Sequence, residues 1–404
     1  MQKNKKSRFV FILGIISIYL LMGFEILVMI LPFAVYYYSV YRPVMEFLYS
    51  SPLTRWSTGF FFPHLVFTND PLINAISWLQ LLFIIGLFMF FISALQLYYV
   101  RIFKRGVAKR GLYTKIRHPQ YLALAVAGLG LLLYWPRFDI LVLYVTMLFV
   151  YYLLARDEEG RMRRKFGETY EGYARRTSMF IPGEPGGRLY KRLFFDRIRP
   201  RGLGIFVLYI LAVSLSVSAA FALRGYCIKH IPKVLAGDTM IVPVFPRPAG
   251  RVLDLYKTVT SDDRVKKDLG PNDKLVYIMP GDYFLMAVVT DEPRRFPEFM
   301  EREFPRILEW RYKKYHGSLG SFFRIYRNFI RAKEESRGYD VERFLFVNVT
   351  SGDGKPVSGN DVFKTGNIRS AALLVDMDAR SRKIILVKAL SGLTKWGRLP
   401  MPVF

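Results

Sequence analysis

The sequence predicts a multi-pass α-helical membrane protein of about five transmembrane helices, including a short helical hairpin, with a carboxy-terminal extramembrane α+β domain. Two observations lead to this fold class. Hydrophobic residues make up 52% of the 404-residue chain, and its mean hydropathy is +0.19, an apolar excess that an ordinary soluble enzyme does not carry. Long apolar runs lie before residue 224, whereas short β-rich runs follow it.

The chain is also strongly basic, with 59 Lys and Arg residues against 32 Asp and Glu residues. In a soluble protein this balance suggests nucleic acid, but in an apolar chain it is typical of cytoplasmic loops beside anionic lipid, so we expect no nucleic-acid partner. The single cysteine, Cys227, excludes an internal disulfide and a multi-cysteine metal site. The four histidines show no paired-ligand spacing, so we expect no bound metal.

The apolar runs define the expected helices, because about 20 helical residues cross the hydrocarbon core. The first run follows the basic start MQKNKKSR and is too long for a signal peptide, so we expect an uncleaved helix that Pro32 kinks or ends. Two shorter runs flank Trp135, Pro136 and Arg137 and predict an antiparallel hairpin. The expected helices are 9–41, 73–100, 121–134, 140–155 and 201–223.

Loop charges predict the orientation of these helices. The loop 101–117 contains Lys and Arg but no acidic residue, and segment 156–201 is again dense in basic residues, whereas loop 38–70 is nearly neutral. By the positive-inside rule the amino terminus and both basic segments face the cytoplasm. Five crossings then place residues 224–404 outside, because long domains translocate largely regardless of their charge.

We therefore expect three parts: a membrane domain in residues 1–200 with a cytoplasmic segment at 156–201, a fifth helix at 201–223, and an extracytoplasmic α+β domain at 224–404 whose role is unknown. A Gly- and Pro-rich linker is expected at 182–201. Helical spacing of apolar residues runs through 297–337. Strands are expected at 239–245, 275–279, 283–290, 344–349, 371–376 and 383–390.

Ionisable residues gather at the cytoplasmic mouth of the hairpin. Arg117 and His118 precede its first helix, and Arg156, Glu158 and Glu159 end its second. Such groups at the ends of membrane helices are candidates for a functional site when they point inward. Each also has a structural alternative: the arginines as interface anchors, the histidine as a helix-start residue, and the glutamates as a solvated charge run.

Small and aromatic residues accompany this cluster. Gly128 and Gly130 form a Gly-x-Gly step inside the hairpin, which is not a dinucleotide fingerprint because no strand precedes it, and which close helix packing would also explain. Tyr170 and Tyr173 follow the acidic pair and are alternatively an aromatic belt.

Taken together, segment 111–182 resembles the isoprenylcysteine carboxyl methyltransferase and phospholipid methyltransferase family of integral membrane enzymes. The family pattern runs G-x-Y-x-x-x-R-H-P-x-Y, an apolar hairpin, E-E, F-G-x-x-Y-x-x-Y and a closing I-P. It is met here by Gly111, Tyr113, Arg117, His118, Pro119, Tyr121, Glu158, Glu159, Phe166, Gly167, Tyr170, Tyr173, Ile181 and Pro182. The resemblance covers about 70 residues and leaves 224–404 outside it.

The resemblance implies methyl transfer from S-adenosylmethionine to a membrane lipid or lipid-modified acceptor at the cytoplasmic face. The glutamates suit the ammonium or ribose hydroxyls of the cofactor, and Arg117 or His118 suits its carboxylate. Arg156 would orient an acceptor carboxylate, whereas His118 or a glutamate would deprotonate an acceptor amine. The implied cofactor-binding residues are Tyr113, Arg117, His118, Pro119, Tyr121, Gly128, Gly130, Glu158, Glu159 and Tyr170.

Two other functions remain open from the sequence. Membrane reductases of the sterol type share a similar helical architecture but use NADPH; the Glu158-Glu159 pair and the Gly128-x-Gly130 step favour the methyl donor. Alternatively, the helices are an anchor and the large tail is a non-enzymatic binding module for an envelope partner. A tail that binds a partner is also compatible with a methyltransferase in the membrane.

Overall fold

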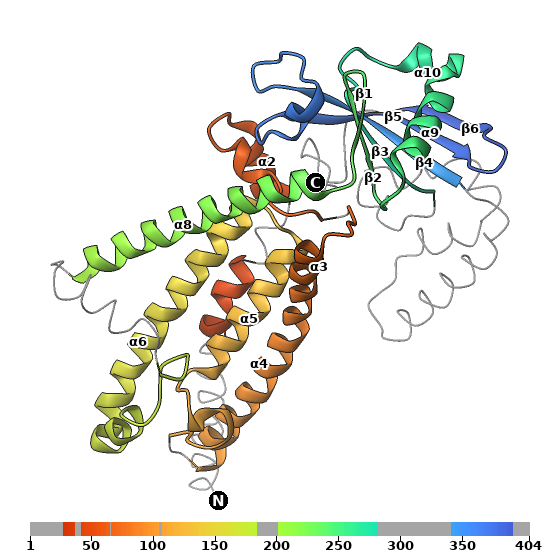
Figure 1. Cartoon of the computed structure of the whole chain (residues 1–404). Helices are drawn as coiled ribbons and strands as arrows, with labels where there is room; N and C mark the ends of the chain where they lie inside the picture. Colours follow the sequence, from red (N-terminus) through yellow and green to blue (C-terminus); the bar gives the residue numbers. More distant parts are fainter. Residues whose placement is uncertain are drawn as a thin grey trace, which may run out of the picture. The chain divides into compact units, whose positions relative to one another are not determined.

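The structure is a computed structural model that describes residues 27–36, 42–64, 66–104, 107–183, 201–281 and 341–390 (Figure 1). It divides into two compact units. The first contains 1–41, 76–135 and 139–219, and the second contains 42–75, 136–138 and 220–404. We call them the helical unit and the sheet unit and describe each by itself.

Among the described residues, three stretches of helix are long and apolar enough to cross a membrane, and two shorter apolar helices accompany them. These three correspond to the expected helices 73–100, 140–155 and 201–223, but the expected count of about five spans is not confirmed. The long stretches are Pro71–Tyr99, made of α3 (Pro71–Trp78), η2 (Leu79–Leu81) and α4 (Leu82–Tyr99), then α6 (Phe138–Ala174) and α8 (Arg201–His230). The shorter ones are Leu27–Tyr36 and α5 (Pro119–Tyr134).

Glycines bring α4 and α5 of the helical unit into close contact. A Cβ atom at Gly86 would lie 2.3 Å from the backbone nitrogen of Ala127, and one at Gly130 would lie 2.1 Å from that of Phe83. Backbone atoms have no room to move away, so only glycine permits this packing. The helix Leu27–Tyr36 joins them through the hydroxyl of Tyr36, which donates to the carbonyl oxygen of Gly128 at 2.9 Å.

Helix α6 extends 19 residues beyond the end expected for the hairpin. Its regular course breaks at Gly167, which has φ 47° and ψ −128°, a conformation that favours glycine. After Ala174 the chain returns to the start of the hairpin. There the backbone N–H of Arg117 donates to the carbonyl oxygen of Ser178 at 2.8 Å, and that of His118 donates to Met179 at 3.1 Å. This pairing fixes the position from which α5 begins.

The sheet unit contains a six-stranded sheet in the order β1-β2-β3-β4-β5-β6 (Figure 1). Only β2 and β3 are parallel, and α9 (Ala249–Ser261) and α10 (Asp263–Asp268) connect them. Apolar residues of both helices pack against one face of the sheet. The strands are β1 (Val234–Ala236), β2 (Thr239–Pro243), β3 (Leu275–Pro280), β4 (Val341–Thr350), β5 (Ile368–Asp378) and β6 (Ile384–Ala389).

Five of the six expected strands are confirmed. The sixth, 283–290, and the expected helix 297–337 lie outside the described residues, as does most of the expected linker. Strand β1 and helices α9 and α10 were not predicted from the sequence, because β1 has only three residues and the helices follow the Pro-rich segment 243–248.

Loop 42–75, the hairpin turn 136–138 and the end of α8 all belong to the sheet unit. Arg137 donates a hydrogen bond to the carbonyl oxygen of Thr58, and its guanidinium lies 4.1 Å from the centroid of the Phe60 ring. Arg224 of α8 donates to the carbonyl oxygens of Phe60 and Phe363. Two buried arginines therefore fasten this loop to the turn of the hairpin and to the sheet domain.

Candidate functional site

The site is built from the segment that leads into α5. Its first turn, η4 (Gly111–Thr114), begins at a glycine with φ 61°, where a Cβ atom would lie 2.5 Å from the side chain of Gln96. The buried hydroxyl of Tyr113 lies 3.1 Å from the side-chain oxygen of Gln120, to which it can donate. The hydroxyl of Tyr173 donates to the carbonyl oxygen of Tyr113 at 2.7 Å. These contacts hold the segment against α5 and the end of α6.

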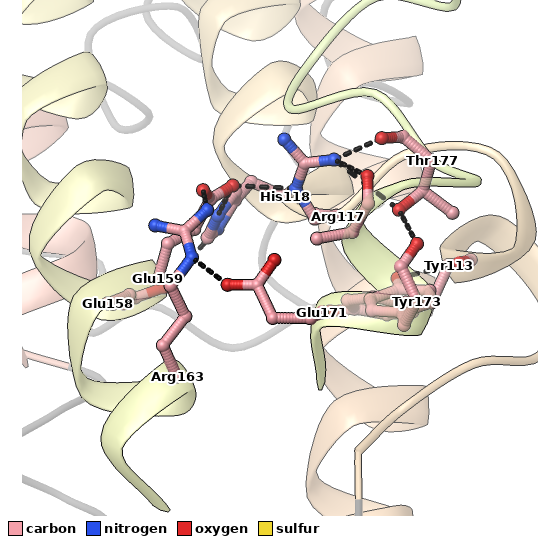
Figure 2. A network of polar contacts seen from close by, with 10 residues as sticks. Tyr113, Arg117, His118, Glu158, Glu159, Arg163, Glu171, Tyr173 and Thr177 are labelled. Carbon is pink, nitrogen blue, oxygen red and sulfur yellow. Dashed lines mark hydrogen bonds and ion pairs between the residues drawn. The ribbon is translucent and has the colours of Figure 1, made fainter. Parts of the chain in front are cut away.

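Arg117 lies at the centre of the site (Figure 2). Its Nε donates to Oε1 of Glu159 at 2.6 Å, and its Nη1 donates to the carbonyl oxygens of Ala174, at 2.9 Å, and Thr177. One guanidinium thus ties together the entrance of α5, the middle of α6 and the chain that returns after α6. Such charge-assisted bonds are strong in a partly dry site.

His118 lies between Glu158 and Glu159 of α6. Its Nδ1 is 3.3 Å from Oε2 of Glu158, and its Nε2 is 3.6 Å from Oε1 of Glu159. The hydroxyl of Tyr121 donates to Oε1 of Glu158 at 2.6 Å. The side chain of Glu159 is 5% exposed and that of Glu158 is 34% exposed. Glu158 is therefore the carboxylate that a ligand from outside can reach.

The carboxylates also determine the protonation of His118. Burial lowers the pKa of this imidazole, but hydrogen bonding and charge interactions with Glu158 and Glu159 raise it, and they prevail, so the pKa lies above its ordinary value of 6.5. The two carboxylates therefore stabilise the charged imidazolium relative to the neutral imidazole.

A second arginine extends the network toward solvent. Nη2 of the exposed Arg163 lies 3.2 Å from Oε2 of Glu159. Its Nε donates to Oε1 of Glu171 at 2.8 Å (Figure 2). Glu171 follows the break at Gly167, so this ion pair spans the change in helix direction. Arg163 and Glu171 were not identified from the sequence, because charged residues at helical spacing are typical of any solvated helix. Thr177 was not identified either, since it contacts Arg117 mainly through its backbone carbonyl oxygen, which any residue has.

Aromatic rings enclose the inner side of the site. The ring of Tyr121 stacks on His118, with centroids 5.6 Å apart, and on Tyr151, with centroids 4.9 Å apart. Phe180 of the returning segment lies 5.9 Å from the imidazole. These rings limit the access of water to His118, which strengthens the electrostatic interactions around it.

The other residues singled out from the sequence lie in different surroundings. Arg156 is exposed and its guanidinium lies 5.7 Å from the ring centroid of Tyr152, so the structure does not bring it into the network around Arg117. Gly130 packs against the backbone of Phe83, and a Cβ atom at Gly128 would lie 2.9 Å from the side chain of Met147. Both glycines therefore have a role in helix packing. Pro119 is the first residue of α5, and Tyr170 is buried beside Tyr173.

One of three comparisons with known proteins gave a match. The model of a family described as phospholipid methyltransferase matches residues 72–169, which contain α4, α5 and most of α6 with Arg117, His118, Glu158 and Glu159. The resemblance drawn from the sequence is thus confirmed for this part of the chain, which is similar to a family of membrane methyltransferases. A comparison with curated proteins gave no match. None was found among solved structures either.

The donor set suits S-adenosylmethionine better than it suits a metal. Within the described ranges, no three His, Cys, Asp or Glu side chains meet in a way that could hold an ion. A part-exposed carboxylate on Glu158, beside the buried imidazole of His118 and stacked aromatic rings, matches a ligand with an ammonium, hydroxyls and a carboxylate. Arg117 is engaged by Glu159 and by two carbonyl oxygens, so it fits a role in holding the site together.

Proposed function

We propose that this protein transfers the methyl group of S-adenosylmethionine to a lipid or lipid-modified acceptor at the membrane surface. The observation that supports it most is a coincidence of two findings. The segment similar to phospholipid methyltransferases is also the segment whose ionisable residues converge in one partly buried network. The comparisons give no support to an NADPH-dependent reductase.

In this proposal Glu158 binds the ammonium or the ribose hydroxyls of the cofactor, while His118 orients its carboxylate. The contact of Glu159 with Arg117 holds α5, α6 and the returning segment together. When bound, the cofactor supplies an electrophilic methyl carbon on a sulfonium sulfur. The surrounding residues contribute alignment and the exclusion of water, which can lower the barrier by about 7–11 kcal/mol.

The acceptor atom attacks the methyl carbon, the carbon–sulfur bond breaks, and S-adenosylhomocysteine leaves. A carboxylate acceptor carries no proton to lose, whereas an ammonium acceptor must first give a proton to a base. Glu158 is the candidate for that base, because its carboxylate is part-exposed, whereas Glu158 and Glu159 favour the protonated form of His118. We assign Arg156 no contact with the acceptor, because it lies exposed beside Tyr152.

We place the site on the cytoplasmic side. Basic loop 101–117 leads directly into Arg117 and His118, and positive loops remain inside. Five crossings from a cytoplasmic amino terminus would then put residues 224–404 outside, because long domains translocate largely regardless of their charge. A role for that domain in binding an envelope partner stays a prediction.

Transfer of a labelled methyl group to lipid extracts tests this proposal. We expect label in the organic phase with the intact protein and none with His118→Ala. Alkaline hydrolysis of the product then distinguishes the acceptors, because a methyl ester releases methanol whereas an N-methyl group is stable. Absence of label in lipid, from protein that binds the methyl donor, would contradict a lipid acceptor.

A further inference from the structure

The short helix α2 (Arg42–Ser50) in the loop before α3 has two different faces. Met45 and Tyr49 point into the protein and are buried. Phe47 is 76% exposed, and Leu53, which follows the helix, is 85% exposed. Large apolar side chains this exposed, close together in the sequence, mark a surface that another apolar phase covers.

The segment after α2 lies at the end of two membrane-spanning helices. Trp56 of η1 (Arg55–Thr58) packs against Phe138 and Phe221, with ring centroids 5.6 Å and 5.7 Å apart. Phe138 is the first residue of α6, and Phe221 lies in α8. A tryptophan at the end of a membrane helix is typical of the boundary between lipid and water.

Side-chain contacts attach α2 firmly to this boundary segment. The Thr54 hydroxyl donates to the carbonyl oxygen of Leu48 at 2.6 Å, and Arg55 Nε donates to that of Tyr49 at 3.0 Å. The Arg55 guanidinium also lies 5.4 Å from the Tyr49 ring centroid. The charge of Arg55 thus lies beside buried Tyr49, whereas Val44 and Phe47 of α2 are exposed.

We propose that α2 and Leu53 form an interfacial anchor that inserts Phe47 and Leu53 into the lipid leaflet on the side of the sheet domain. Amphipathic helices bind in this way, with their apolar face at the boundary of headgroups and acyl chains. Continuity favours lipid as the occupant, since α2 lies in the chain between the apolar helix Leu27–Tyr36 and the span Pro71–Tyr99. The anchor is independent of the proposed methyl transfer.

The single cysteine makes a site-specific test practical. Cys227 is buried and free, so Cys227→Ala gives a cysteine-free background. Phe47→Cys and Leu53→Cys are each labelled with an environment-sensitive fluorophore and reconstituted in liposomes with and without brominated lipids. Leu53 lies outside the helix and is largely exposed, so its replacement leaves the core intact. Asp263→Cys on α10, whose side chain is exposed, is the control.

We expect brominated lipid to quench the fluorescence of the probes at 47 and 53, because an interfacial helix lies at the boundary of headgroups and acyl chains, and to leave the probe at 263 unchanged. Equal, weak quenching at all three positions would overturn the proposal. Self-quenching at 47 that rises with the protein-to-lipid ratio would also overturn it, because a second copy would then cover this face.

Discussion

Arg117 and Glu159 form the central contact of the site, with Nε and Oε1 2.6 Å apart and both side chains nearly buried. They are 42 residues apart in sequence and come from the two arms of the hairpin, one before α5 and the other within α6. Because Arg117 also binds two carbonyl oxygens near the end of α6, this contact determines how three segments meet.

Replacing Glu159 by Gln should therefore destabilise the protein. Arg117 would be left buried without its carboxylate, and breaking a buried ion pair costs about 3 kcal/mol. Thermal unfolding in detergent measures this change. Glu171→Gln is the matched control. Because Glu171 pairs with exposed Arg163, we expect its free energy of unfolding to fall by at most about 1 kcal/mol. Equal losses in the two variants would contradict a central role for Glu159.

Replacing Gly130 by Ala should separate α4 from α5. The new methyl group would lie 2.1 Å from the backbone nitrogen of Phe83, so the helices must move, at a cost of about 2 kcal/mol. Gly172→Ala in α6 is the control, because a Cβ atom at this position would have no neighbouring atom within 4 Å. Alanine should stabilise the helix there by about 0.5–1 kcal/mol. Thermal stabilities that change in the same direction would contradict this explanation.

The raised pKa of His118 predicts a dependence of stability on pH. A group whose pKa is higher in the folded state stabilises the protein fully below its unfolded pKa and loses this contribution as the pH rises through the folded value. The stability of the protein relative to His118→Gln should accordingly fall as pH rises above 6.5. Unfolding curves of both proteins over a pH series measure it. A difference that grows with pH would show that the imidazole is neutral in the folded protein.

Arg224 should stabilise the packing of Phe60 and Phe363 against the end of α8. Arg224→Met removes the two hydrogen bonds to their carbonyl oxygens, and we expect the free energy of unfolding to fall by about 3 kcal/mol. Lys229→Met, on the same helix but exposed, should change stability little. Limited proteolysis in liposomes measures this change, because loosened packing exposes the chain to the protease. Resistance equal to that of the unchanged protein would contradict this role.

The parts that could be predicted from the sequence are those with a local signal. Apolar length predicted α4, α5 and α8, and short β-rich runs predicted β2 to β6. The meeting of Arg117, His118, Glu158 and Glu159 followed from their shared position at the mouth of the hairpin. The end of α6 was not predictable, because Gly167 breaks its course without ending it. Arg156 looked equivalent to Arg117 in sequence, and only the rotation of α6 places it outside the network.

The most direct test of the account is binding of S-adenosylmethionine to the detergent-purified protein with lipid present, measured by calorimetry with NADPH as the control ligand. We expect saturable binding of S-adenosylmethionine and none of NADPH. Glu158→Gln should weaken the binding by about tenfold, the effect of one charge-assisted hydrogen bond. Asp157→Asn, whose exposed carboxylate pairs with Arg161, should not weaken it. Absence of S-adenosylmethionine binding, or binding of NADPH in its place, would contradict the proposed function.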